Sequence, residues 1–102
     1  MKILHMTLHR KWFDQIAEGI KKEEYREFKE YWFNRLVGKE YDVICFKNGY
    51  SKNCPEMIIE YNGVTLKNIM WDSGITEDVL AIQLGNIIEI KNYNDFSTNG
   101  RV

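Results

Sequence analysis

The densest group of ionisable side chains in this sequence lies at residues 19–26, which read GIKKEEYR. It begins with Gly19, a residue type typical of the position after a helix because it takes the left-handed conformation without strain. Lys21, Glu24 and Arg26 follow within a few residues. A carboxylate between two cations is held in one orientation, and the planar fork of an arginine suits a phosphate group or the edge of a nucleobase. The segment is therefore a candidate site.

The alternative interpretation of this segment is structural. In an extended strand Lys22, Glu24 and Arg26 share one face, and Tyr25 points to the other. Charged side chains of this kind commonly protect the edge strand of a sheet from pairing with other chains. Spacing alone favours this solvated edge strand over a site.

A second polar group lies at residues 46–55, which read FKNGYSKNCP. The segment combines cations, amides and an aromatic ring, the side chains that bind single-stranded nucleic acid by its phosphates, base edges and base faces. The structural alternative is a connection that needs its Asn-Gly pair only for positive φ angles. The candidate ligand-binding residues here are Asn48, Tyr50, Lys52 and Asn53, with Lys47 beside them.

Other reactive side chains give weaker signals. His5 and His9 have a spacing that suits a metal on a helix, but the first is expected on a strand, and no cysteine or carboxylate pattern completes a site. No metal and no other cofactor is therefore expected. Cys45 falls in an apolar strand and is expected in the core. Cys54 is expected on a loop, where only nearby lysines favour a reactive thiol.

Two short helices must position the first of these groups. Apolar residues recur at helical spacing over residues 12–20 and again over residues 28–37, which predicts two helices, each ended by a glycine. Trp12, Trp32 and Phe33 fall on the apolar faces of these helices. They are interpreted as core residues.

Strands are expected over most of the remaining chain, because the other segments alternate or are rich in β-branched and aromatic residues. Asn62-Gly63 is the strongest hairpin signal in the sequence, and Asp72-Ser73-Gly74 predicts a further turn, beside which Trp71 fits either the core or a ligand. The last two strands are either separate or joined, with Gly85 as a bulge or bend. The expected strands are residues 2–8, 21–27, 41–47, 57–61, 64–71, 79–84 and 86–91.

This order of elements predicts an α+β fold with five to six mostly antiparallel strands and two flanking helices. A parallel sheet is disfavoured because the second half of the chain has no room for crossover helices. A small closed or nearly closed barrel would leave no exposed edge. No linker or repeat divides the chain, so one domain is expected over residues 1–92, followed by a polar tail over residues 93–102.

The overall composition limits the class of protein. With 102 residues and 44% hydrophobic residues, the chain fits one folded domain rather than a disordered segment. No apolar run approaches the roughly 20 residues of a membrane helix. The first residues do not read as a signal peptide, and two cysteines make no disulfide framework, so a cytoplasmic protein without membrane contact is expected.

The net charge is −1, which argues against binding nucleic acid by bulk positive charge alone. The charges are nevertheless unevenly placed: residues 1–52 hold 11 Lys and Arg against 8 Asp and Glu, and residues 53–102 hold 3 against 7. The basic half could present a positive face to a short anionic ligand, or the two halves could intermix in the fold.

The residues described above also carry a family resemblance. The pattern GxKxxExR is matched at Gly19, Lys21, Glu24 and Arg26, after a hydrophobic strand and the helix WFDQIAEG and far before the apolar run VLAIQLGNIIEI. Over residues 3–91 the chain resembles the ASCH family (activating signal cointegrator homology) of the PUA-like superfamily, in its small bacterial and phage form. The run EYREFKEYWFNRL is also similar to that form.

The resemblance implies a PUA-like small β-barrel with flanking helices and a cleft near the motif. Single-stranded RNA or a nucleotide-like small molecule is the implied ligand. Lys21, Glu24 and Arg26 are expected to form the floor of the cleft, and residues 48–53 its wall.

One branch of the family implies an enzyme instead. The chain resembles the small bacterial acetylcytidine amidohydrolases, in which a Lys, a Thr and a downstream Glu are taken as the catalytic set. Lys21 matches the lysine, but Glu24 stands in place of the threonine and removes the hydroxyl nucleophile. The alternative function is thus a hydrolase of acylated cytidine, or of RNA as in members associated with ribonuclease activity, with Glu24 activating water beside Lys21. The downstream acid stays open among Glu60, Asp72 and Glu77.

A third interpretation, a protein-interaction module, predicts an exposed apolar patch on the folded chain.

Overall fold

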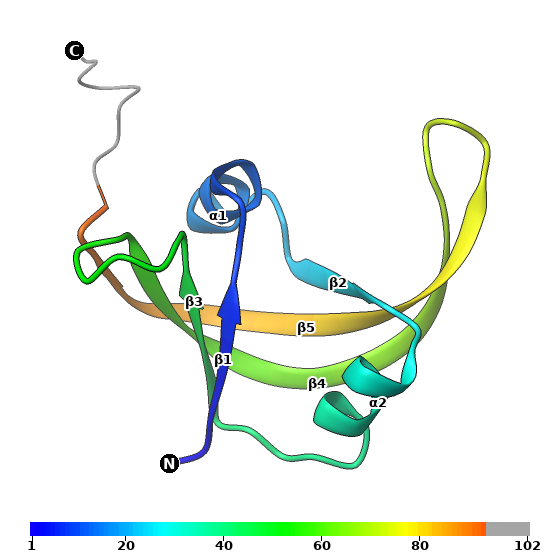
Figure 1. The fold of residues 1–102 in the computed structure, drawn as a ribbon, viewed down its shortest axis with the longest axis horizontal. Helices are drawn as coiled ribbons and strands as arrows, with labels where there is room; N and C mark the ends of the chain where they lie inside the picture. Colours follow the sequence, from blue (N-terminus) through cyan, green and yellow to red (C-terminus); the bar gives the residue numbers. More distant parts are fainter. Residues whose placement is uncertain (94–102) are drawn as a thin grey trace.

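The computed structural model describes residues 1–93, and Figure 1 shows them as a strongly curved sheet of five strands with two helices. The strands lie in the order β1-β3-β4-β5-β2; β1 pairs with β3 in parallel, and the other pairings are antiparallel. The predicted α+β class and the mostly antiparallel sheet are therefore confirmed. The strands are β1 (Ile3–Thr7), β2 (Glu23–Glu27), β3 (Val43–Lys47), β4 (Glu56–Met70) and β5 (Thr76–Lys91).

The sheet is open. Among residues 1–93 no strand pairing joins β1 to β2, so each of these strands has one unpaired edge. Closure into a barrel is thus not seen in the described part of the chain. The opening between β1 and β2 is where the candidate site lies.

The two helices flank β2 in the chain. Helix α1 (Arg10–Ala17) buries Phe13 and Ile16, and helix α2 (Glu30–Leu36) buries Leu36. Phe33 does not join the core as predicted, since it is 42% exposed. Helix α2 has only seven residues and turns a narrow face inward, so that Trp32 packs against the core while partly buried and Tyr31 is 57% exposed.

The long β4–β5 hairpin corrects the predicted strand boundaries. The Asn62-Gly63 pair is not a hairpin turn, because β4 runs through it and pairs with β5 on both sides. Gly63 has a positive φ of 101°, and the register shifts around it, as in a β-bulge. The turn of the hairpin lies instead at the predicted Asp72–Gly74 position, where the Trp71 amide donates to the Ile75 carbonyl.

Strand β5 is one continuous strand, which confirms one of the two alternatives for residues 79–91. Gly85 lies opposite the irregular part of β4. A Cβ atom at Gly85 would lie 2.7 Å from Glu60 Oε1 and 2.9 Å from Glu60 Cβ. Gly85 therefore allows the two strands to approach closely here.

The core lies inside the curve of the sheet, under α1. It is built from β1, β3, β4, β5 and the inner faces of both helices. Tyr93 packs beside it, with its ring 5.4 Å from the ring of Phe13 and its hydroxyl donating to Asp14 at 2.9 Å. The rest of the expected tail, residues 94–102, lies outside the described residues. No helix in residues 1–93 is long and apolar enough to cross a membrane.

Candidate functional site

A cavity of about 450 Å³ lies between the end of β1 and strand β2, the two edge strands of the sheet. It combines charged groups with aromatic residues, and its volume falls in the range of small-ligand sites, roughly 300–1,000 Å³. Its lining residues are Thr7, Leu8, His9, Trp12, Lys21, Glu24, Tyr25, Arg26 and Trp71.

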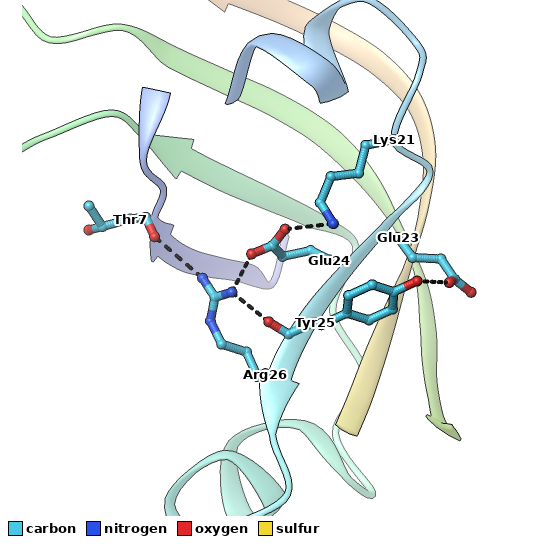
Figure 2. A network of polar contacts seen from close by, with 6 residues as sticks. All are labelled: Thr7, Lys21, Glu23, Glu24, Tyr25 and Arg26. Carbon is cyan, nitrogen blue, oxygen red and sulfur yellow. Dashed lines mark hydrogen bonds and ion pairs between the residues drawn. The ribbon is translucent and has the colours of Figure 1, made fainter. Parts of the chain in front are cut away.

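Glu24 is the charged residue at the bottom of this cavity. It is only 4% exposed, and its β2 position pairs with Ile82 of β5, so the carboxylate sits at the margin of the core. Lys21 Nζ lies 3.5 Å from one carboxylate oxygen, and Arg26 pairs with the other (Figure 2). A buried carboxylate is costly unless it is paired, and these two cations supply the pairing.

Arg26 connects the two edge strands. Besides Glu24, its guanidinium donates to the carbonyl of Tyr25 at 2.8 Å and to the carbonyl of Thr7 in β1 at 3.3 Å. Figure 2 shows these contacts converging on one side of β2, with the Thr7 side chain pointing away from Glu24. Arg26 therefore positions Glu24 and spans the opening of the sheet, and much of its donor capacity is already used.

Lys21 is the freer cation of the site. Its position follows from the end of α1, where the amides of Gly19 and Ile20 donate to the carbonyls of Ile16 and Gln15, a Schellman motif that requires the positive φ of Gly19. Within residues 1–93 its ammonium group has Glu24 as its only ion-pair partner. Two of its three donors stay available to a ligand.

Aromatic residues surround the ammonium group of Lys21. Its Nζ lies 4.6 Å from the centre of the Tyr25 ring and 5.3 Å from that of Trp12. The Tyr25 ring meets the Trp71 ring edge-on at 6.2 Å, which brings the β4–β5 turn to the cavity. Burial, and secondarily the adjacent Glu23 carboxylate, raises the pKa of Tyr25.

The structure brings the motif residues Lys21, Glu24 and Arg26 together, and it differs only from the strand-face interpretation, which placed Lys22 beside Glu24. Glu24 and Arg26 project from one side of β2 and Tyr25 from the other, as an extended strand requires. The lysine beside Glu24 is Lys21 rather than Lys22, because the strand begins only at Glu23 and the turn before it directs Lys21 inward.

The predicted wall at residues 48–53 is not gathered around Glu24. Asn48 has a structural role, because its side-chain amide donates to the Leu8 carbonyl at 2.9 Å. Tyr50 is 92% exposed and lines a second cavity, of about 510 Å³, which shares Thr7 and Arg26 with the first. Lys52 and Asn53 are exposed and line neither cavity.

Trp12 and Trp71 also line the cavity, whereas the sequence places Trp12 in the core and leaves Trp71 open between the core and a ligand. Trp12 precedes the buried Phe13 and therefore lies at the margin of the apolar helix face, where it is 36% exposed and lines the cavity. In the sequence, the place of Trp12 at the start of the apolar pattern, directly before Phe13, is the one signal that could have indicated this role. Trp71 is brought to the cavity by the β4–β5 hairpin, whose turn at Asp72–Gly74 the sequence predicts but whose length it does not.

The two thiols lie outside the first cavity. Cys45 is buried as predicted, and burial, followed by the nearby Glu56, raises its pKa to about 11. Cys54 is on the predicted loop but is also buried, with its thiol directed to the Gly49 carbonyl at 3.6 Å. Within residues 1–93 no group of three or more His, Cys, Asp or Glu side chains is placed to hold a metal ion.

Exposed apolar residues are spread over several elements rather than confined to one. They include Ile20, Phe28, Leu66, Met70, Ile75 and Ile88.

Comparison of the chain with protein-family models, with curated proteins and with solved structures finds no match.

Proposed function

We propose that the protein is an ASCH-like domain of the PUA-like type that binds single-stranded RNA or a modified nucleoside in the cavity between β1 and β2. On this proposal the curved sheet is a small barrel whose remaining opening is the ligand cleft, and the protein acts in the cytoplasm. The observation that carries the proposal is the buried Glu24, held by Lys21 and Arg26 at the bottom of a cavity with aromatic walls.

The chemistry of these groups suits a nucleobase. Glu24 accepts hydrogen bonds, as from an exocyclic amine, and Lys21 donates them to a ring nitrogen or carbonyl oxygen. Trp12, Tyr25 and Trp71 offer apolar faces beside these groups, and base–aromatic stacking contributes roughly 1–3 kcal/mol per base. The cavity therefore combines base-edge and base-face recognition.

The test measures binding of a short fluorescent single-stranded RNA by anisotropy at two salt concentrations. Lys21→Ala is expected to weaken binding about tenfold, because it removes the freer cation of the site. Glu24→Gln keeps the shape of the side chain and changes base preference. Lys39→Ala is the matched control, since Lys39 is exposed and lines neither cavity. Equal, weak binding by the wild type and all variants would contradict the proposal.

A second candidate function is hydrolysis of an acylated cytidine or of RNA. It is favoured by one observation, the 3.5 Å contact between Lys21 Nζ and Glu24 Oε1 inside the cavity. On an acylated cytidine, Glu24 takes a proton from water, the hydroxide adds to the acyl carbon, and Lys21 stabilises the developing oxyanion. The proton then passes to the departing amine as the bond to it breaks.

The hydrolase is tested by chromatography of N-acylated cytidine and of RNA after incubation with the protein. Product formation by the wild type, abolished in both Lys21→Ala and Glu24→Gln, would establish it. Absence of product with the wild type removes this candidate and leaves the binding proposal in place.

A further inference from the structure

The second cavity, of about 510 Å³, is a groove beside the first whose charged lining residues are all cationic. It is lined by cationic side chains of β2, α2 and β3 together with aromatic rings of α2, and none of its lining residues is an Asp or Glu. Thr7 and Arg26 belong to both cavities, so the two adjoin. The residues used below are Arg26, Tyr31, Trp32, Arg35, Lys47 and Tyr50.

Arg35 is the main unpaired cation of this groove. Its guanidinium lies 5.5 Å from the centre of the Tyr31 ring and 5.8 Å from that of Trp32, so two aromatic rings hold it in place. Its Nε atom is buried without a hydrogen-bond partner, and no ion pair to Arg35 is present within residues 1–93. Because Nε itself is shielded from solvent, an anion in the groove would instead contact the terminal nitrogens of the guanidinium, whose charge no described acid offsets.

Two further cations face the same groove. Arg26 lies 5.2 Å from the centre of the Trp32 ring, so Arg26 and Arg35 approach the same indole. Lys47 contacts Glu56 only at the limit of an ion pair, 4.0 Å, and its side chain is 48% exposed. Like charges gathered without an acid among the lining residues attract an anion, which reduces their mutual repulsion.

We propose that this groove binds a phosphodiester of the RNA strand, next to the nucleotide whose base occupies the first cavity. Arg35 and Lys47 donate to the phosphate oxygens, and the shared Arg26 marks the junction between base and phosphate. The exposed Tyr50 lies where a neighbouring base can stack. This inference rests on the proposed function and sharpens it: the ligand is a strand of RNA rather than a free nucleoside.

The test compares two mixed-sequence RNA pentamers, one with natural phosphodiesters and one with uncharged methylphosphonate linkages. Arg35→Gln is expected to weaken binding of the natural pentamer about tenfold and to reduce the slope of log K against log salt by about 0.7. It leaves binding of the methylphosphonate pentamer unchanged, because that ligand has no charge for Arg35 to contact. Lys47→Gln acts in the same direction and, being at the surface, tests the groove even if Arg35→Gln fails to fold.

Lys39→Gln is the matched control, since it removes one positive charge outside both cavities. If Arg35→Gln and Lys47→Gln both match Lys39→Gln on the natural pentamer, the phosphate groove is wrong. The proposed base site then still stands if Lys21→Ala weakens binding of both pentamers. A Lys21→Ala variant that binds both pentamers normally, beside an impaired Arg35→Gln, supports the groove and removes the base site. Failure of the wild type to bind either pentamer overturns both.

Discussion

At the scale of single residues, β2 directs two neighbouring carboxylates, those of Glu23 and Glu24, into different environments. Glu24 faces the cavity and the core, whereas Glu23 faces the other side of the sheet. There Glu23 accepts hydrogen bonds from Lys67 of β4 and from Gln83 of β5. These contacts, led by that of Lys67, lower the pKa of Glu23 to about 2. Glu23 therefore ties β2 to the hairpin, and Glu24 is left to the site.

The lowered pKa of Glu23 predicts a loss of stability in acid. Between about pH 4.5 and pH 2 the unfolded chain binds the proton and the folded chain does not, so stability falls as the pH drops through this window. Glu23→Gln is expected to lower the free energy of unfolding by about 1 kcal/mol at pH 7, and less near pH 2. Urea unfolding at both pH values measures this, with Glu27→Gln, on the exposed end of β2, as the control.

The Tyr41 and Tyr61 pair gives a second residue-scale prediction. Their rings meet edge-on at 5.3 Å, but only Tyr41 has a hydroxyl partner, the Arg35 carbonyl at 2.6 Å. The Tyr61 hydroxyl is buried without a hydrogen-bond partner within residues 1–93, and burial raises its pKa. Tyr61→Phe is expected to raise the free energy of unfolding by about 1 kcal/mol, and Tyr41→Phe to lower it by a similar amount. Thermal unfolding of both variants tests this prediction. Destabilisation by Tyr61→Phe would contradict the prediction.

The part of the candidate site that the sequence predicts is the part built from residues close together in the chain. Lys21, Glu24 and Arg26 lie within six residues, so helix end and strand geometry determine how they meet. Trp71 reaches the cavity from a hairpin tip, and Arg35 reaches the second groove from α2, by packing that is determined over the whole fold. No short sequence pattern predicts that Trp71 lines the first cavity or that Arg35 lines the second.

At the scale of elements, the error at Asn62-Gly63 shows where short patterns fail. The pair signals positive φ, which a hairpin turn and a β-bulge both use. Whether a turn or a bulge forms depends on the partner strand. Here β5 is long enough to pair with β4 both before and after Asn62-Gly63, so a bulge forms. The helices and β1 could be predicted because the spacing of apolar residues within each segment is enough to identify it.

The close approach at Gly85 gives the prediction at this scale. Gly85→Ala is expected to destabilise the protein by about 1–3 kcal/mol, because the new methyl group meets Glu60, whose Oε1 already accepts from the Asn86 amide at 2.8 Å. In the Glu60→Ala background the same substitution should cost less, since the 2.7 Å contact with Glu60 Oε1 is removed, although the Cβ of residue 60 at 2.9 Å and Asn62 Nδ2 at 2.8 Å remain. Equal costs in the two backgrounds, measured by urea unfolding, would show that Glu60 is not the obstacle.

At the scale of the whole molecule, the net charge of −1 conceals a local concentration of cations. The lysines and arginines that line the two cavities all come from the first 52 residues, and Glu24 is the one acid among the lining residues. The basic half of the sequence thus supplies the face on which an anionic ligand would lie. These cations are few, which limits the length of strand that they can hold.

This limit predicts how affinity depends on RNA length. Affinity is expected to rise up to about three nucleotides and then level off, because four Lys and Arg residues line the cavities and only Arg35 and Lys47 are assigned to phosphates. The slope of log K against log salt should be about −1.4 at the plateau, about −0.7 for each of these two cations. Anisotropy measurements on RNAs of two to ten nucleotides check this, and a steady rise over the whole series would indicate a longer basic path.

The unpaired edges of β1 and β2 give the protein an internal reporter of occupancy. The cavity lies between them, so a bound ligand that contacts both would hold the sheet together where backbone pairing does not. Such a ligand favours the folded state in proportion to its affinity and slows hydrogen exchange at these two edges. The melting temperature of the protein is therefore itself a binding assay. A panel of nucleosides and short RNAs can be ranked by the rise in melting temperature that each causes. This measurement needs no label and no knowledge of a reaction.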